Sequence, residues 1–202
     1  MTVQNPAAAP GAAKAIRANP AYLTDTSVAQ AQHSEPTVTL YGRIAAGPVG
    51  YVSWPDPPDL HFSIIIDDAY SGITVLDGQP TMMEAGIRNM ALIRTNRYDN
   101  ALPSGVRVRI PLQPPQGMSR QEFAHRIVVS SQRFVSYVAP YSAPKNIRGS
   151  QMRAGEYNSS SYVAGLLQSV MGHAPSISAP GFQAPGWENP IPGHFFKGEA
   201  IR

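Results

Sequence analysis

The hydrophobic pattern in the first half of the chain is of the β type, made of short apolar runs between turn residues. The clearest run is Leu60–Ile66 (LHFSIII), nearly continuous, rich in Ile and bounded by turn residues, as a buried strand requires. A turn over Asp67–Gly72 follows, and then a second apolar run, Ile73–Leu76, which ends at Asp77 and Gly78. Together these segments predict a hairpin with a six-residue loop.

Other segments extend the strand block on both sides of this hairpin. Thr37–Ile44 (TVTLYGRI) is rich in β-forming residues, and Gly47–Trp54 and Ala91–Arg94 are predicted as further short strands. Val106–Leu112 (VRVRIPL) alternates strictly, with apolar residues on one face and arginines on the other, which predicts a half-buried strand. Pro111 places this strand near an edge of the sheet or near a strand end.

The second half of the chain changes to helical spacing. Ser119 and Glu122 have the S-x-x-E spacing of a capping box, and apolar residues at helical intervals extend the predicted helix to about Tyr137. A second helix is predicted to begin at Asn158–Ser160 and to close at Gly172. Its apolar stripe consists of Val163, Leu166, Leu167 and Val170. A strand block followed by two helices predicts an α+β fold, a small antiparallel sheet packed against two main helices.

The two ends of the chain differ in amino-acid composition from the strand and helix segments between them. Residues 1–35 are rich in Ala and Pro and are predicted to form a flexible leader. Residues 36–202 are predicted to form a single domain, because 202 residues suit one domain with a loose end. The last 30 residues hold five prolines and several aromatic residues, so we expect this tail to wrap onto the domain.

Composition excludes several classes of function. Cysteine is absent, which excludes disulfides, thiolate zinc sites, iron–sulfur clusters and a thiol nucleophile. The net charge of +3 comes without a run of Lys or Arg, so we predict no nucleic-acid partner. No stretch approaches the ~18 apolar residues of a membrane span, and the N-terminus lacks the apolar region of a Sec signal peptide. No nucleotide-binding or α/β-hydrolase motif occurs.

Of the five histidines, only His61 lies in a predicted core strand. A buried imidazole requires hydrogen-bond partners, so His61 is either a satisfied core residue or a functional group. His125 is expected on the surface of the first helix, and His33, His173 and His194 fall in predicted loops.

A metal site is not expected. Asp59 and His61 share a predicted strand face, and Asp67 and Asp68 follow, but no established metal-ligand spacing occurs. We therefore predict neither a metal nor a cofactor.

Asn158, Ser159 and Ser160 place small polar side chains at the first turn of the second helix. Any of them could serve as the N-cap of that helix. The functional alternative is a nucleophilic hydroxyl at the helix N-terminus, where main-chain N–H groups and the helix dipole stabilise an anion. A serine nucleophile needs a general base within hydrogen-bond reach, and His61 is the candidate.

These motifs resemble the circularly permuted papain-like fold of NlpC-type peptidoglycan amidases and the lecithin–retinol acyltransferase group. The similarity lies in a strand that opens with His (LHFSIIID), a return strand (ITVLDG), and, much later, Tyr157–Val163 (YNSSSYV) at the start of a helix. In those families an Asn-Cys-x-x-Phe-Val type motif carries the nucleophilic cysteine. Asn158, Tyr162 and Val163 match it, and Ser159 stands at the cysteine position. The similarity covers about residues 37–195.

The resemblance implies a hydrolase or acyl-transfer domain that cleaves an amide or ester, with Ser159 as nucleophile and His61 as base. Asp77 would orient the imidazole; Asp67, Asp68 and Glu84 are alternatives, and each is equally an ordinary turn carboxylate. Asn158 and Ser160 would border the substrate and the oxyanion hole.

The same resemblance implies a peptidoglycan peptide or another target of a bacterial effector as substrate, with a delivery or immunity protein as a further partner. Such a protein is made in the bacterial cytoplasm and would be exported, if at all, by a route other than Sec. The serine is compatible with a true serine nucleophile, with an engineered inactive form, or with a degenerate module that binds without cleaving, in an effector or a phage-like particle.

Overall fold

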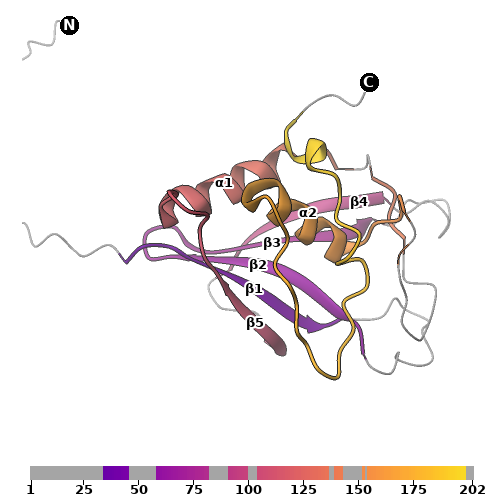
Figure 1. The fold of residues 1–202 in the computed structure, drawn as a ribbon. Coiled ribbons are helices and arrows are strands. Elements are labelled where there is room, and N and C mark those ends of the chain that lie inside the picture. Colours follow the sequence, from indigo (N-terminus) through magenta and orange to yellow (C-terminus); the bar gives the residue numbers. More distant parts are fainter. Residues whose placement is uncertain are drawn as a thin grey trace, which may run out of the picture. The chain divides into compact units, whose positions relative to one another are not determined.

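The computed structural model describes a five-stranded sheet, two α-helices and a long C-terminal segment (Figure 1). The described residues are 34–45, 58–81, 91–99, 104–136, 139–142, 152 and 154–198. The predicted leader up to residue 33, the predicted strand Gly47–Trp54 and the alternative Glu84 lie outside them. No helix in these ranges is both long and apolar enough to cross a membrane.

The sheet is antiparallel throughout, with the strand order β4-β3-β2-β1-β5. Its strands are β1 (Thr37–Ile44), β2 (Leu60–Asp68), β3 (Gly72–Thr81), β4 (Ala91–Asp99) and β5 (Val106–Leu112). β5 is an edge strand, as Pro111 predicts, and its arginines are exposed while Val106, Val108 and Ile110 are half-buried. The predicted α+β fold is therefore confirmed.

The β2–β3 hairpin is tighter than the predicted six-residue loop. Both strands extend into the turn, which consists of residues 69–71. The Asp68 carboxylate accepts hydrogen bonds from the Tyr70 N–H and the Ser71 hydroxyl, and Gly72 has the left-handed φ of +79° that closes such a turn. Local side-chain hydrogen bonds thus shorten the loop.

β3 also runs further than predicted, because β4 pairs with it along its length. Asp77 and Gly78, expected to end the strand, face Thr95 and Arg94 in the ladder. The neighbouring strand satisfies their main-chain groups, so the turn preference of Asp-Gly is overridden. Asp77 therefore lies in the middle of a strand.

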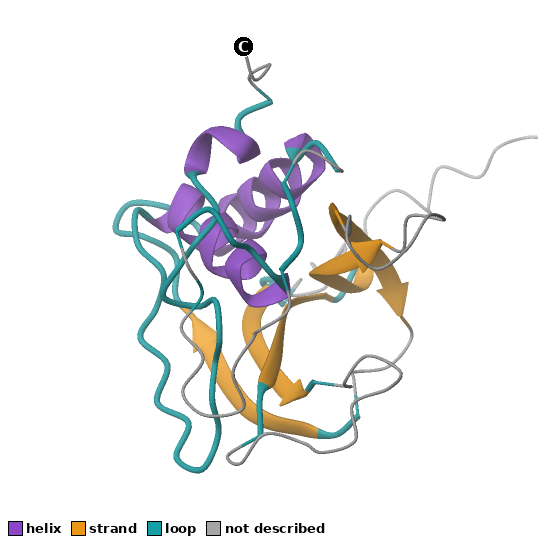
Figure 2. Ribbon diagram, turned by 90° about the vertical axis from the view of Figure 1, so that its right-hand side faces the viewer, coloured by secondary structure: helices purple, strands orange, loops and turns teal. Residues whose placement is uncertain are grey.

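The helices α1 (Arg120–Arg133) and α2 (Ser159–Met171) lie on the same side of the sheet (Figures 1 and 2). α1 begins at the predicted cap, because Ser119 Oγ accepts from the Glu122 N–H at 3.1 Å. α1 ends at Arg133, short of the predicted Tyr137. Phe134 is extended and its ring packs edge-on against Tyr162 at 5.0 Å between centroids, so core packing ends the helix there.

The alternation along the strands separates two apolar clusters. The larger cluster lies between the sheet and the helices and contains Phe62, Ile64 and Leu76 together with Val163 and Leu167. The smaller cluster comes from the intervening strand positions and contains Tyr41, Ile65 and Val75. Because successive side chains of a strand point to opposite faces, this cluster marks the face away from the helices.

The C-terminal segment packs onto the helical layer. The Trp187 ring lies 4.9 Å from that of Phe62, and its indole N–H donates to the carbonyl of Pro175 at 3.0 Å. Further on, the 3₁₀ helix η3 (Gly193–Phe196) buries Phe196 against Tyr162. The tail is thus part of the core of this domain.

Candidate functional site

The histidine and the aspartate singled out in the sequence lie in contact on adjacent strands. His61 Nε2 is 3.3 Å from Asp77 Oδ2. The side chain of His61 is 11% exposed, whereas that of Asp77 is fully buried. Nδ1 of His61 makes no hydrogen bond to any residue that the structure describes, so this nitrogen is left available for proton transfer.

The sheet opens between β2 and β3 at this point. In the described part of both strands, the β2–β3 ladder ends at the pair Ile64–Leu76. Beyond that pair, side chains rather than main-chain groups bridge the two strands: Ser63 Oγ donates to Asp77 Oδ2 at 3.3 Å, and His61 contacts the same oxygen. The candidate base thus lies where β2 is paired with β1 but no longer with β3.

Three polar residues around Asp77 were missed by the sequence analysis. Besides Ser63, Gln79 Nε2 donates to Asp77 Oδ2 at 3.1 Å and lies 3.3 Å from His61 Nε2. On the other side, the Thr95 hydroxyl donates to Asp77 Oδ1. These donors satisfy a carboxylate that burial alone would disfavour. The strand alternation that pairs His61 with Ser63 and Asp77 with Gln79 was the available signal.

Asn158 is the N-cap of α2. Its Oδ1 accepts from the Ser161 N–H at 3.0 Å, and its amide donates to the carbonyl of Pro185 at 2.9 Å. The cap itself was anticipated, and Gly172 closes the helix as predicted, with a left-handed φ of 82°. Asn158 therefore has two structural roles: it caps α2 and it holds the C-terminal segment at Pro185.

Ser160 ties the start of α2 to the candidate base strand. Its hydroxyl donates to the carbonyl of Leu60, the residue before His61, at 3.4 Å. Ser159 is 7% exposed and its hydroxyl makes no hydrogen bond to a described residue. The structure therefore brings the helix start beside β2, but no hydrogen bond joins Ser159 to His61.

The alternation of side chains along β2 determines which face of the sheet His61 occupies. Leu60 and Phe62 belong to the cluster that packs against the helices, and His61 occupies the alternate position between them. α2 itself packs on β2 and β3, the two strands that separate at His61. His61 therefore points to the face of the sheet away from α2, so a reaction that uses both Ser159 and His61 requires their side chains to meet where the β2–β3 ladder ends.

The C-terminal segment covers the start of α2. Ser161 Oγ donates to the carbonyl of Gly186 at 3.0 Å, and the Ile191 N–H donates to the carbonyl of Ser161 at 3.0 Å. Nearby, Leu60 receives main-chain pairing from Gln183, whose carbonyl accepts the Leu60 N–H at 2.8 Å. The tail thus forms one wall of the candidate site.

Asp59 immediately precedes β2, and its carboxyl group is less well hydrogen-bonded than that of Asp77. Its Oδ1 is buried and has no hydrogen-bond partner among the described residues. Burial raises the pKa of this carboxyl group above its usual range. Among the described residues, no cluster of three or more His, Asp or Glu side chains could hold a metal ion.

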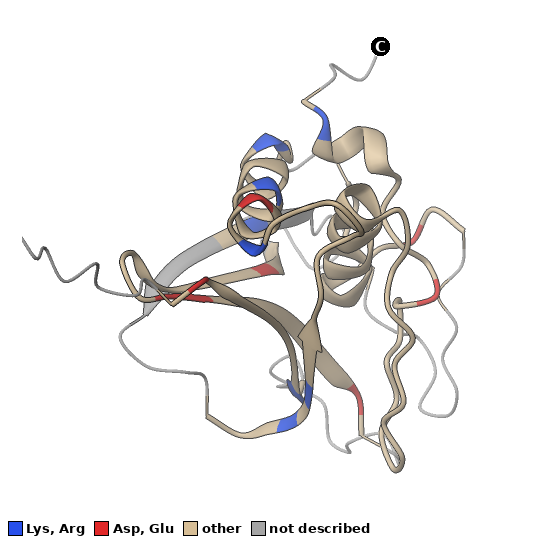
Figure 3. Cartoon of the chain, turned by 60° about the vertical axis from the view of Figure 1, so that its left-hand side comes forward, with Lys and Arg blue, Asp and Glu red and all other residues tan. Residues whose placement is uncertain are grey.

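The other candidates lie elsewhere. Asp67 is exposed at the hairpin and Asp68 closes its turn, while His125, His173 and His194 are exposed. Figure 3 shows Lys and Arg on α1, on the sheet and near the C-terminal end rather than gathered on one element. The charges of the described residues therefore mark no second site.

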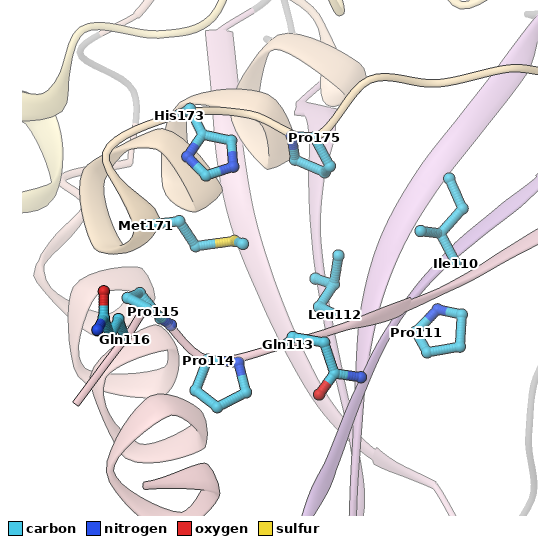
Figure 4. Close-up of a pocket in the computed structure, with 10 residues that line it drawn as sticks. All are labelled: Ile110, Pro111, Leu112, Gln113, Pro114, Pro115, Gln116, Met171, His173 and Pro175. Atoms are coloured by element: carbon cyan, nitrogen blue, oxygen red, sulfur yellow. The ribbon is translucent and has the colours of Figure 1, made fainter. Parts of the chain in front are cut away.

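A separate cavity of about 460 Å³ lies between the β5–α1 connection and the end of α2 (Figure 4). It is lined by residues 110–116 and by Met171, His173 and Pro175. No carboxylate lines it, and His61 and Ser159 are not among its residues. It offers apolar surface without an acid–base pair.

Comparisons of the chain with protein-family models, curated proteins and solved structures found no match. The similarity to papain-like domains therefore rests on the residues themselves. Those residues are the strand His61, its partner Asp77, and the helix start Asn158–Val163.

Proposed function

We propose that this chain is a papain-like acyl-transfer or hydrolase domain that acts on an amide or ester and carries serine at the nucleophile position. The observation that supports the proposal most is the His61–Asp77 pair. Asp77 contacts Nε2 of the imidazole, so the Nδ1 nitrogen can act as the base. A histidine held in this way is the base that a hydroxyl nucleophile needs.

In the proposed reaction, Ser159 Oγ attacks the carbonyl carbon of the substrate and His61 Nδ1 takes the hydroxyl proton. His61 then gives that proton to the leaving amine or alcohol as the bond to the carbonyl carbon breaks. Water, or an acceptor hydroxyl or amine, attacks the acyl-serine and restores the enzyme. Asp77 remains a carboxylate and orients the ring.

The start of α2 supports this assignment through its electrostatics. Ser159 is the first residue of a 13-residue helix, where unpaired N–H groups and the helix dipole favour negative charge. The developing oxyanion would gain from the same groups. Because Asn158 and Ser160 are engaged in structural hydrogen bonds, their proposed part is limited to shaping the site.

The proposed substrate class is an amide or ester of a bacterial cell wall or of another effector target, as the resemblance to NlpC-type amidases implies. A bacterial effector protein with this activity would meet a delivery or immunity protein as its partner. The proposed location follows from the same resemblance: synthesis in the bacterial cytoplasm, and export without a Sec signal peptide.

A binding module is the second candidate, and a specific observation favours it. The C-terminal segment covers the start of α2, and Ser159 makes no hydrogen bond to His61 among the described residues. A domain of this kind would hold a cell-wall peptide or a particle component without cleaving it.

The deciding experiment compares the parent chain with its Ser159→Cys and Ser159→Ala variants on purified peptidoglycan and on simple acyl esters. A thiolate is the stronger nucleophile at neutral pH, so a hydrolase predicts a gain with cysteine and a loss with alanine. Ser160→Cys is the matched control, because that position is tied to Leu60. Equal turnover by the parent and Ser159→Ala would remove Ser159 as nucleophile, and binding without turnover by all variants would favour the second candidate.

A further inference from the structure

Three neutral side chains, one on each of three strands, donate hydrogen bonds to the carboxylate of Asp77. Ser63 on β2 and Gln79 on β3 donate to Oδ2, and Thr95 on β4 donates to Oδ1. The Thr95 hydroxyl also lies 3.4 Å from the main-chain carbonyl of Asp77. Since an ionised carboxylate only accepts hydrogen bonds, these donors stabilise Asp77 as an acceptor.

This arrangement constrains the proton on the neighbouring imidazole. His61 Nε2 is 3.3 Å from an oxygen that accepts and 3.3 Å from the Gln79 amide nitrogen, which only donates. If Nε2 carried a lone pair, that lone pair would face the carboxylate oxygen. If Nε2 carries the hydrogen, it donates to Asp77. The second arrangement is the one that electrostatics favours.

We infer that Ser63 and Thr95 are positioning residues that hold His61 in the tautomer with hydrogen on Nε2 and the lone pair on Nδ1. They act through Asp77 and touch no substrate in the proposed reaction. The catalytic value of this tautomer rests on the proposed function, but the tautomer itself does not. Ser63 and Thr95 contribute from opposite sides of Asp77, one on each oxygen.

The orientation of the Gln79 amide follows from the same network. With the amide nitrogen toward Asp77, Gln79 donates to the carboxylate at 3.1 Å. With the amide reversed, its oxygen would face a carboxylate oxygen at that distance, which is repulsive. Gln79 therefore donates to Asp77, but the same amide nitrogen also faces His61 Nε2 as a donor, so Gln79 does not select the tautomer with hydrogen on Nε2.

The test is a long-range ¹H–¹⁵N NMR spectrum of the histidine rings in the full chain, recorded at about pH 9, where free imidazoles are neutral. His61→Gln identifies the His61 signals by their loss. The parent is expected to show the Nε2–H pattern for His61. Thr95→Val and Ser63→Ala are expected to mix in the Nδ1–H pattern, and Thr95→Ser, which keeps the hydroxyl, is expected to restore the parent spectrum.

Thr39→Val is the matched control, because Thr39 is a buried threonine of the same sheet with no contact to Asp77. It should leave the His61 pattern unchanged. An Nδ1–H pattern in the parent would overturn the inference, even if the variants failed to fold, and so would an unchanged pattern in the folded Thr95→Val and Ser63→Ala double variant. An Nε2–H pattern in a protein without any acyl-transfer activity would refute the proposed function and leave this inference standing.

Discussion

The Ser160 hydroxyl donates a hydrogen bond to the main-chain carbonyl of Leu60 at 3.4 Å, across 100 residues of sequence. This contact joins the start of α2 to the residue before His61. Two segments that the sequence separates widely are thereby neighbours in the fold.

Gly186→Ala should destabilise the protein strongly. Gly186 has a φ of +87°, and a Cβ there would overlap the capping oxygen of Asn158 and lie 2.7 Å from Ser161 Oγ. We expect a loss of about 2–5 kcal/mol, the sum of about 1–2 for the left-handed backbone and about 1–3 for overpacking. Urea unfolding measures the change.

Gly181→Ala is the control for this prediction. Gly181 has a similar φ of +79°, but no atom lies within 4 Å of the added Cβ. Only the backbone cost of about 1–2 kcal/mol is then expected. Equal losses in the two variants would mean that the tail does not pack against the α2 cap as described.

Tyr162 predicts an alkaline limit to stability. Burial raises the pKa of its phenol far above the ordinary value, an effect to which the charge of Asp77 adds and which the Ser131 hydrogen bond and Arg94 oppose. Because the pKa of this phenol is higher in the folded than in the unfolded state, the neutral phenol makes its full contribution to the free energy of unfolding below about pH 10, the pKa of tyrosine in the unfolded chain. That contribution is lost as the pH rises further. The free energy of unfolding should therefore fall steeply above about pH 10.

Tyr162→Phe should weaken that alkaline dependence while removing the hydrogen bond to Ser131 at 2.8 Å, a loss of about 1–2 kcal/mol at neutral pH. Tyr70→Phe is the control, since Tyr70 is 89% exposed. Urea unfolding at neutral and alkaline pH measures both effects. The same alkaline slope in Tyr162→Phe and the parent would contradict the assignment.

The partly buried carboxyl group of Asp59 predicts that the free energy of unfolding changes with pH in the acidic range. Burial raises the pKa of the Asp59 carboxyl group in the folded state. The protonated group therefore makes its full contribution to the free energy of unfolding below the unfolded pKa of about 3.9, and this contribution is lost as the pH rises through the folded pKa. Asp59→Asn should therefore be more stable than the parent at neutral pH, by less than about 1 kcal/mol because solvent screens this partly exposed group.

The difference between Asp59→Asn and the parent should disappear below about pH 4. Urea unfolding at several pH values measures it, with Asp67→Asn as an exposed control. A difference that stays constant with pH would show that the carboxyl group of Asp59 is not the cause.

The sequence predicted the elements whose signal is local. The apolar run of β2, the alternation of β5 and both caps of α2 appear where expected. The end of α1 was missed because Phe134 leaves the helix to pack in the core, a tertiary effect. The length of β3 was missed because its partner β4 sustains it.

The contact between His61 and Asp77 was predicted, but its polar neighbours were not, in part because of the hairpin register. A six-residue loop would place Ile66 opposite Ile73, whereas the actual ladder pairs Ile66 with Thr74. A shift of one residue exchanges the two faces of a strand. Only the actual register brings Ser63 to Asp77, whereas Gln79 lies two residues from Asp77 on the same strand, and Thr95 required knowledge of the β4 pairing.

The most direct test of the central claim asks whether His61 acts on position 159, and it needs no substrate. The chain contains no cysteine, so the Ser159→Cys variant carries a single thiol whose alkylation by iodoacetamide can be followed by intact mass. At about pH 6, where an ordinary thiol of pKa about 8.5 reacts slowly, we expect rapid alkylation that His61→Ala slows by about tenfold or more. Asp77→Asn should slow it in the same direction.

Ser169→Cys, on an exposed part of α2, is the control: its alkylation rate is that of an ordinary exposed thiol and should not change when His61→Ala is added. A fast, His61-dependent reaction at position 159 is the result that the proposed site predicts. A thiol at position 159 that reacts no faster than the control, at a rate that His61→Ala leaves unchanged, would contradict it.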